Sequence, residues 1–297
     1  MTSMKDNIYS EINREFIEQY FPRRKANTHK GSYGTVSLFV GSKAYRGAAH
    51  LALGAALRAG AGYVRFVGEG ELARELRMKY PEAIYSSDLT EDEIVSTLAA
   101  SSSVVIGSGS GVSMTLADIT TRTVMSSHAK VLIDADAINS IASFGGINDL
   151  STPDSRVILT PHPLEFSRIS GLDISEISAD RISTAKAFAA KYRVTLLLKG
   201  HRTVVTDGER VLVNTTGSPA LSKGGSGDVL SGLIGALAAY IKDPLIAAAL
   251  GAYLHGAAAD ILCREYSTLG VTPSDLPREI ARIMASIERK LSPVYYT

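Results

Sequence analysis

Short apolar runs rich in β-branched residues alternate with longer helical patterns, and this alternation constrains the fold more than any other feature of the sequence. Strands bounded by helical segments in this way predict βαβ units and a parallel sheet. The strand candidates are almost continuously apolar, which is typical of a sheet covered by helices on both faces. The strand-like segments are 35–42, 62–68, 103–111, 130–139 and 156–163, and the helix-like segments between them are 48–61, 70–80, 90–101 and 113–127.

The second half of the chain changes its pattern. After a helical segment at 178–193, three closely spaced strand candidates follow at 195–200, 203–208 and 210–217, with Asp207 and Gly208 as turn residues. Such spacing predicts an antiparallel meander at the edge of the sheet. From Gly225 the pattern is helical nearly to the end, with Asp243 and Ser274 as expected N-caps of the last two helices.

These elements predict an α/β protein with three αβα layers, a mostly parallel central sheet and an edge β-meander. No stretch has the composition of a linker and no internal repeat is found, so residues 1–297 are expected to form a single domain. Residues 1–28 are expected to be an N-terminal helical extension, an amphipathic helix with Ile12, Phe16 and Tyr20 on one side.

Charge and cysteine content exclude several classes of protein. Lys and Arg number 31 and Asp and Glu 30, so the net charge is +1, and neither nucleic acid nor an anionic membrane is an expected partner. Cys263 is the only cysteine, which leaves no intrachain disulfide and no CxxC metal site. The first 25 residues lack the apolar core of a signal peptide. No uncharged apolar run approaches the roughly 18 to 20 residues of a membrane span. We expect a cytoplasmic protein.

The most informative motif is SKGGSGDVLSG, residues 222–232. Gly224, Gly225 and Gly227 let backbone N–H groups converge, and the helix expected from about Asp228 directs its positive dipole end to the same point. Such a site binds a phosphate or a developing anion. The alternative is that the glycines form a tight turn and Asp228 caps the helix.

The motif differs from the common nucleotide-binding loops. It contains no GK[ST] and is not a P-loop, and it follows an edge meander rather than the first strand, so it is not a dinucleotide fingerprint. What remains is an anion pocket beside a carboxylate. A carboxylate in that position can take the proton from a hydroxyl that attacks a bound phosphoryl group.

A second candidate is VILTPHPLEF, residues 157–166. His162 and Glu165 follow the end of a strand, and open parallel sheets bind ligands at the carboxyl ends of their strands. His162 is suited to contact a polar group of a ligand, and Glu165 to hold the water shell of a magnesium ion. Ordinary solvated loop residues are the alternative.

Three weaker candidates remain. Lys199 ends a strand and is followed by polar donors in LLLKGHRT, which are either beside a nucleotide or in a hydrated hairpin turn. Asp134 and Asp136 bind a ligand or metal, or simply end a strand. His255 lies in an apolar helical pattern and is expected to be a packed side chain.

Taken in order, the motifs resemble the NAD(P)H-hydrate dehydratase family, a ribokinase-like branch of the carbohydrate kinases. The resemblance extends from about His29 to about Pro277, and its blocks are HKGSYG, VIGSGSG, LIDADAIN, LTPHPLEF, LLLKG and GGSGDVLSG. It implies repair of hydrated NADH and NADPH, called NADHX and NADPHX, at the expense of ADP or alternatively ATP. The C6 hydroxyl of the S epimer is phosphorylated, and loss of phosphate restores the double bond and releases AMP.

The resemblance also implies roles for individual residues. Asp228 would be the catalytic base and a contact of the substrate. The hydrated cofactor would also contact Ala48, Gly109 and His162. Glu165 would hold Mg²⁺ through water. The nucleotide would lie along Lys199, Gly200, His201, Arg202 and Thr203 and against Gly225, Ser226 and Gly227, whose amides would cradle the transferred phosphoryl.

The chain departs from the family pattern at Ser108, where proline is usual, at Leu164, where glycine is usual, and at Ser226, where threonine is usual. We expect Ser108 to loosen its loop and Leu164 to exclude a positive φ at its position. The resemblance further implies ADP as the preferred nucleotide and a homo-oligomer, with a tetramer as the expected form. Because only about 28 residues precede the HKG block, it also implies that the epimerase is a separate protein or absent.

Two rival functions share the GGSGD motif. One is a ribokinase-like transferase that phosphorylates a vitamin-precursor alcohol and releases the ester. The other is a nucleotide-binding module without catalysis. Neither accounts for HKGSYG and PHPLE together with an intact Asp228.

Overall fold

The computed structural model describes residues 9–291, which form a ten-stranded sheet in the order β1-β10-β9-β8-β7-β6-β5-β2-β3-β4. Every pairing is parallel except β8 with β9 and β9 with β10. The strands are β1 (Ser10–Ile12), β2 (Thr35–Phe39), β3 (Tyr63–Gly68), β4 (Ile84–Ser87), β5 (Ser103–Ile106), β6 (Lys130–Ile133), β7 (Val157–Leu159), β8 (Thr195–Leu198), β9 (Val204–Thr206) and β10 (Val211–Asn214).

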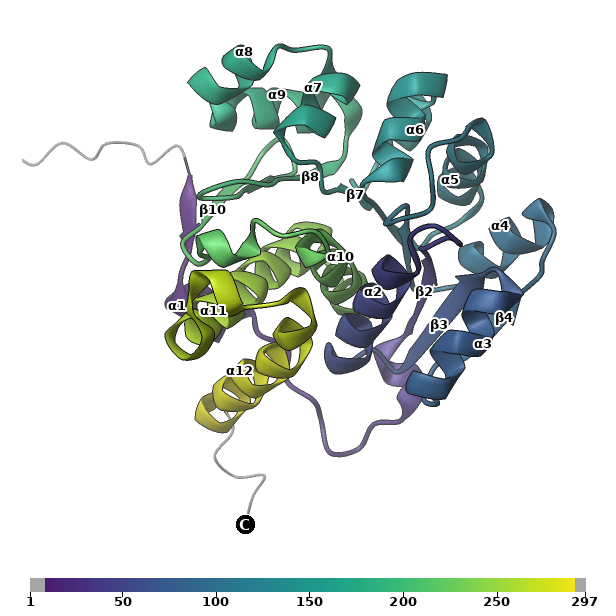
Figure 1. The fold of residues 1–297 in the computed structure, drawn as a ribbon. Helices are drawn as coiled ribbons and strands as arrows, with labels where there is room; N and C mark the ends of the chain where they lie inside the picture. Colours follow the sequence, from purple (N-terminus) through teal and green to yellow (C-terminus); the bar gives the residue numbers. More distant parts are fainter. Residues whose placement is uncertain (1–8, 292–297) are drawn as a thin grey trace, which may run out of the picture.

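Helices cover both faces of this sheet (Figure 1). One face packs against α1 (Arg14–Tyr20), α2 (Arg46–Arg58), α3 (Gly70–Lys79), α10 (Ser226–Ala238), α11 (Pro244–Gly270) and α12 (Leu276–Leu291). The other packs against α4 (Glu91–Ala99), α5 (Met114–Ser126), α6 (Asp136–Phe144), α7 (Pro163–Ser170), α8 (Ile174–Ala179) and α9 (Arg181–Tyr192).

Alternate residues of the central strands supply the two cores. On β5, Val105 belongs to the first core and its neighbours Val104 and Ile106 to the second. Because successive side chains of a strand point to opposite faces, a continuous apolar run can fill both layers at once. The prediction of a three-layer αβα protein with a mostly parallel sheet is confirmed.

The predicted meander is present as β8, β9 and β10, but it does not form the outer edge. Strand β1 pairs in parallel with β10, Ile12 lying opposite Asn214. The Thr215 hydroxyl donates to the Ile12 carbonyl at 2.9 Å and ties the two segments together beyond the ladder. The N-terminal segment therefore extends the sheet by one strand.

The expected helix over residues 1–28 is wrong for most of residues 9–28, the part of it that the structure describes. Ile12 lies in β1, and only seven residues from Arg14 to Tyr20 are helical, capped by the Asn13 side chain. Residues 1–8 lie outside the described part of the chain. A three-residue strand cannot be distinguished from a helix start by periodicity, because neither pattern completes one repeat.

Of the two predicted N-caps, Asp243 is confirmed and Ser274 is wrong. Asp243 caps α11, its side chain accepting from the Leu245 N–H, as expected. Ser274 does not cap the last helix. It lies within a short 3-10 turn, Pro273–Asp275, whose capping box is formed by Thr272 and Asp275, and α12 begins after it.

Strand ends were predicted too late in the chain. The strand candidate at 130–139 ends at Ile133, and α6 starts at Asp136. The GSGSG residues after Ile106 and the prolines after Leu159 likewise lie outside their strands. These polar segments are the loops at the carboxyl edge of the sheet.

Helix α11 is the one helix within residues 9–291 that is long and apolar enough to cross a bilayer, which departs from the expectation that no such segment exists. Its most apolar window is 78% buried against the rest of the molecule. A helix that is surrounded by other protein elements is apolar on all sides, as a membrane span is, because none of its faces contacts water. The burial of α11 therefore accounts for its composition as a core helix.

Candidate active site

The carboxyl ends of the parallel strands meet at one edge of the sheet, and the polar motifs gather there. Backbone hydrogen bonds connect the loops: the Gly41 N–H donates to the Ser108 carbonyl at 2.7 Å, and the Lys199 N–H donates to the Pro161 carbonyl at 2.9 Å. The N-terminus of α10 reaches the same edge. Open parallel sheets bind ligands in this position.

The GGSGD segment begins α10 with several N–H groups unbonded. Gly225 is the N-cap with φ of 99°, a left-handed conformation that glycine adopts without strain. The Ser226 N–H donates to the Lys223 carbonyl at 3.2 Å. The N–H groups of Gly225, Gly227 and Asp228 have no acceptor among the described residues. The Ser226 N–H is therefore already used within the turn, whereas the Asp228 N–H is free to donate to an anion.

Asp228 does not cap the helix, so the structural alternative for this residue is wrong. No side chain caps α10, and no hydrogen bond to the Asp228 carboxylate is formed by the described residues. Burial, together with the nearby negative charge of Asp134, raises the pKa of Asp228 to about 6, against a smaller opposing effect of Lys199. A half-buried carboxylate with a pKa near neutrality and no fixed donor is suited to accept a proton.

Lys199 is held beside Asp228 by a buried carboxylate. Its Nζ lies 2.9 Å from Oδ1 of Asp134, which is buried at the end of β6. A Cβ on Gly227 would lie 3.6 Å from the same Nζ, so the ammonium faces the GGSGD turn. Burial acts to lower the pKa of Lys199, but the charges of Asp134, Glu165 and Asp228 outweigh it and raise the pKa. The group is therefore a fixed cation.

The Asp134 carboxylate, which directly follows β6, accepts three hydrogen bonds from within the protein. Besides Lys199, Thr160 Oγ1 donates to Oδ1 at 2.8 Å and Ser108 Oγ donates to Oδ2 at 3.0 Å. Buried charges persist when they are paired and hydrogen-bonded in this way. Asp136, by contrast, accepts from the Gly111 N–H at 2.9 Å and supports the neighbouring loop.

The departure at Ser108 adds contacts that a proline lacks. Its fully buried hydroxyl, which donates to Asp134, also lies 2.9 Å from Ser231 Oγ and can only accept there. The single proton of Ser231 goes either to Ser108 or to the Asp228 carbonyl, which is 3.0 Å away. A chain of hydroxyls thus joins Asp134 to the first turns of α10. Instead of loosening the loop, Ser108 connects the two carboxylate-bearing segments.

His162 and Glu165 form a capping box at the start of α7. His162 Nδ1 accepts from the N–H groups of Leu164 and Glu165 at 3.1 and 3.2 Å, which leaves Nε2 to carry the proton. Glu165 Oε2 accepts from the His162 N–H at 2.8 Å. Leu164 lies in the helix and has no positive φ, so replacing the usual glycine costs no backbone strain.

Glu165 is buried, and its surroundings fit a water-mediated role toward a metal better than direct ligation. No group of three or more metal-ligating side chains exists within residues 9–291. Burial raises the pKa of Glu165 although Lys199 opposes the effect. One oxygen is engaged by backbone, and the other is 3.3 Å from His162 Nε2. A magnesium ion here would need phosphate oxygens and water as its main ligands.

Ala48 and Gly109, expected on the same substrate, lie against each other. A Cβ on Gly109 would be 2.6 Å from the Ala48 Cβ and 2.9 Å from the Tyr45 Cβ, and Gly109 has φ of 66°. Only glycine permits this approach of the GSGSG loop to the start of α2. The two residues border the edge of the sheet next to the Asp134 loop.

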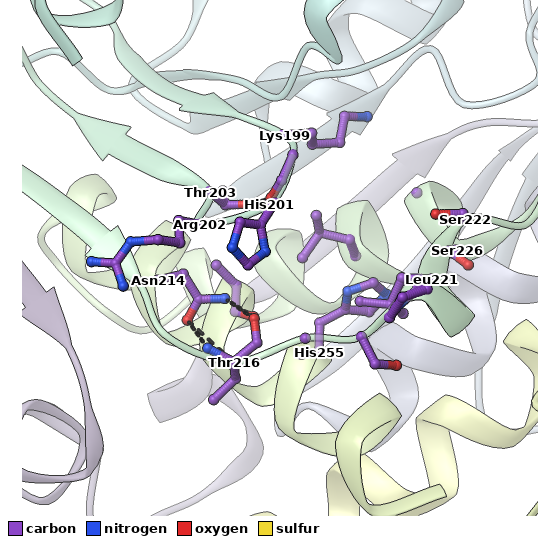
Figure 2. A pocket seen from close by; sticks show the side chains of 18 residues that line it. Lys199, His201, Arg202, Thr203, Asn214, Thr216, Leu221, Ser222, Ser226 and His255 are labelled. Atoms are coloured by element: carbon purple, nitrogen blue, oxygen red, sulfur yellow. Dashed lines mark hydrogen bonds between the residues drawn. The ribbon is translucent and has the colours of Figure 1, made fainter. Parts of the chain in front are cut away.

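A cavity of about 390 Å³ opens beside the Lys199 turn (Figure 2). Its lining includes the five residues expected to contact a nucleotide, Lys199, Gly200, His201, Arg202 and Thr203, together with Ser226 and Gly227. Gly225 is not among the lining residues. The Arg202 guanidinium points away from the cavity and donates to Glu11 Oε1 at 2.8 Å, so its charge pairs with β1.

His255 lines the same cavity, although the sequence indicated only a packed side chain. It is buried, and burial lowers the pKa of its imidazole to about 4 despite a hydrogen bond to the Ser226 backbone. The ring is therefore neutral near pH 7. Packed and cavity-lining are both correct descriptions of it.

Several lining residues gave no signal in the sequence. Asn214, the last residue of β10, and Thr216, two residues beyond it, line the cavity, and Asn214 Nδ2 donates to the Thr216 carbonyl at 3.0 Å. Such contacts depend on how the meander folds over α11. The HKGSYG block, in contrast, lies before β2 at the opposite edge of the sheet, where the Lys30 Nζ lies 5.1 Å from the centre of the Tyr63 ring.

Comparison with known proteins gives consistent matches. A family model described as NAD(P)H-hydrate dehydratase matches residues 36–282. The ADP-dependent (S)-NAD(P)H-hydrate dehydratase of Neisseria meningitidis is 34% identical, the match covering 88% of this chain and 87% of that protein. The structure of the ADP/ATP-dependent NAD(P)H-hydrate dehydratase of Bacillus subtilis, co-crystallised with ATP and Mg²⁺, matches with a TM-score of 0.84 at 30% identity, covering 96% of this chain and 100% of that chain.

Other relatives are longer. The bifunctional NAD(P)H-hydrate repair enzyme of Moorella thermoacetica is 35% identical over 92% of this chain but only 53% of its own length. The chain thus spans about half the length of the bifunctional relatives that it matches.

Proposed function

The chain belongs to the NAD(P)H-hydrate dehydratase family, and on that premise we propose that it dehydrates (S)-NADHX and (S)-NADPHX to NADH and NADPH with ADP as co-substrate. The terminal phosphoryl group of ADP is transferred to the C6 hydroxyl. Loss of that phosphate restores the nicotinamide double bond, so the products are the reduced cofactor, AMP and inorganic phosphate.

One observation carries the proposal. The Asp228 carboxylate has no hydrogen-bond donor within the described residues, its pKa is raised to about 6, and it begins the same turn as the unbonded N–H groups of Gly225 and Gly227. A base and an anion pocket in one turn support transfer of a phosphoryl group to a hydroxyl. A helix cap would account for neither feature.

The proposed reaction uses these groups in sequence. Asp228 accepts the proton of the C6 hydroxyl as its oxygen attacks the terminal phosphorus of ADP. The N–H groups of the GGSGD turn and the Lys199 ammonium stabilise the negative charge of the transferred group. The phosphate then leaves from C6, which water cannot do readily at neutral pH because hydroxide is a poor leaving group.

The substrate and nucleotide occupy neighbouring regions in this proposal. The nucleotide lies in the cavity along residues 199–203, and the hydrated nicotinamide lies toward Ala48, Gly109 and His162. His162 Nε2 carries the proton and lies 3.3 Å from Glu165 Oε1, so a polar group of the cofactor would share this donor with Glu165. Asp228 would act between the two regions, and two observations support this: its charge raises the pKa of Lys199, and the Lys199 ammonium faces the Gly227 backbone.

We propose magnesium as a companion of the nucleotide. It would neutralise phosphate charge, and Glu165 would contact its water shell. A homotetramer and a cytoplasmic location are further proposals from the family resemblance. The reaction takes only the S epimer, so complete repair requires a separate activity that interconverts the epimers.

Incubation of the purified chain with NADHX and ADP tests the proposal. We expect the near-ultraviolet absorbance of NADH to return in proportion to enzyme, and AMP to form. A heated sample of the same preparation is the control. No return of absorbance while ADP is consumed on a small alcohol would instead identify a ribokinase-like kinase.

A further inference from the structure

Arg181 is the first residue of α9 and reaches the turn that follows β8. Its Nη1 donates to the His201 carbonyl at 2.7 Å, and its Nη2 donates to the carbonyls of Leu198 and Lys199 at 3.0 and 3.1 Å. One side chain therefore holds three carbonyl oxygens, one from the last residue of β8 and two from the turn that follows it.

The contact involves a charge that no carboxylate neutralises. Arg181 forms no salt bridge among residues 9–291, and its Nε is buried without a partner. Burial lowers the pKa of the guanidinium. Only the carbonyl dipoles compensate the charge, and burying a charge without an ionic partner costs free energy. This cost suggests that the orientation of those peptides serves a purpose.

The carbonyl directions determine where the N–H groups of the turn point. All peptide bonds described are trans, and in a trans peptide the C=O and N–H groups point in opposite directions. The peptides that join Lys199 to Gly200 and His201 to Arg202 direct their oxygens to Arg181. The N–H groups of Gly200 and Arg202 therefore point away from it, and neither has an acceptor among the described residues.

The opposite side of the turn is the nucleotide cavity. Helix α9 packs in one core and helices α10 and α11 in the other, on the two faces of the sheet (Figure 1). The cavity is lined by residues of α10 and α11 and by the turn itself, whereas Arg181 is not among its lining residues. The unbonded N–H groups thus face the cavity.

We propose that Arg181 is a positioning residue for the nucleotide: it turns the carbonyls of residues 199 and 201 away from the cavity, so that the Gly200 and Arg202 N–H groups can donate to oxygens of a nucleoside diphosphate. This inference rests on the proposed function, because it assigns the cavity to the nucleotide. Arg181 itself touches neither ADP nor the hydrated cofactor. It acts through the backbone of the turn.

Titration calorimetry with ADP on the full chain tests the inference. Arg181→Met should weaken ADP binding roughly ten- to hundredfold, because it releases three charge-assisted hydrogen bonds. Arg181→Lys, which keeps the charge but offers a less suitable donor geometry, should fall between wild type and Arg181→Met. The KM for ADP should rise by the same factor, while kcat at saturating ADP and the KM for NADHX stay within about threefold of wild type.

Lys186→Met is the matched control, because Lys186 is an exposed cation on the same helix. Its ADP affinity should equal that of wild type. If wild type itself fails to bind ADP, the proposed function is wrong. If wild type binds ADP and Arg181→Met binds it equally well, only the role of Arg181 is overturned. Loss of folding in both Arg181 variants, or an equal change in kcat and both KM values, would also contradict it, because Arg181 would then support the body of the protein.

Discussion

Asp228→Asn should lose turnover by at least about 10²- to 10⁴-fold, the usual contribution of a general base, while ADP binding stays within about threefold of wild type. The asparagine has nearly the same shape but cannot accept the proton of the C6 hydroxyl. Steady-state rates with NADHX and calorimetry with ADP measure the two effects separately. An Asn variant with near-normal kcat would remove Asp228 from its role as base.

The pH dependence of wild type gives the same residue a second test. Because burial raises the Asp228 pKa to about 6, kcat/KM should fall as the pH drops through that value, since the base must be ionised. The remaining activity of Asp228→Asn should show no such acidic limb. A limb that persists in the variant would belong to another group.

Ionisation of Asp228, which activity requires, should lower the stability of the folded protein. The folded-state pKa of Asp228 is raised above the ordinary value of 3.8, so ionisation destabilises the folded state. This cost is absent below about pH 4, where the carboxyl is protonated in both states, and is complete above about pH 6. Asp228→Asn should therefore be more stable at pH 8 by about 1 to 3 kcal/mol, from about 1.4 kcal/mol per pKa unit discounted for partial exposure. Thermal unfolding at pH 4 and pH 8 measures the difference.

Lys199→Met should lower kcat by about 10²- to 10³-fold, because it removes a fixed cation from the site of phosphoryl transfer. The same change leaves Asp134 buried without its ammonium partner, 2.9 Å away in wild type. Removing one member of a buried pair commonly costs about 3 to 5 kcal/mol of unfolding free energy. Urea unfolding and steady-state rates measure the two losses.

The double variant Lys199→Met/Asp134→Asn separates these effects. The introduced amide carries no charge and can still bond to Thr160 and Ser108, which contact Asp134 in wild type. Most of the lost stability should return, and turnover should remain low. Recovery of turnover together with stability would show that Lys199 supports the fold and contributes little to phosphoryl transfer.

The layers of the fold could be predicted from the sequence because the strand signal is strong. Val104, Val105 and Ile106 are apolar without interruption, and only a sheet covered on both faces buries them all. Strand β1 could not be predicted, since its three residues pair with residues of β10 that are 202 positions away in the sequence. The position of β1 depends on which strand of the meander lies at the edge of the sheet and is free to pair with it.

The candidate site shows the same division. Asp228 could be singled out because three glycines and a carboxylate begin an apolar helix. The role of Asp134 in joining the site could not be predicted. Its contacts with Ser108, Thr160 and Lys199 connect four loops that meet only in the folded sheet. Arg181 looks in the sequence like an ordinary helix cation, and its function depends on carbonyls about twenty residues later in the chain.

The direct test of the central claim is the stoichiometry of one reaction of the chain with (S)-NADHX and ADP, followed by separation of the nucleotides and phosphorus NMR. The account predicts equal amounts of NADH, AMP and inorganic phosphate, with turnover dependent on Asp228. Phosphorylated NADHX as a stable product, or NADH formed without AMP, would contradict it.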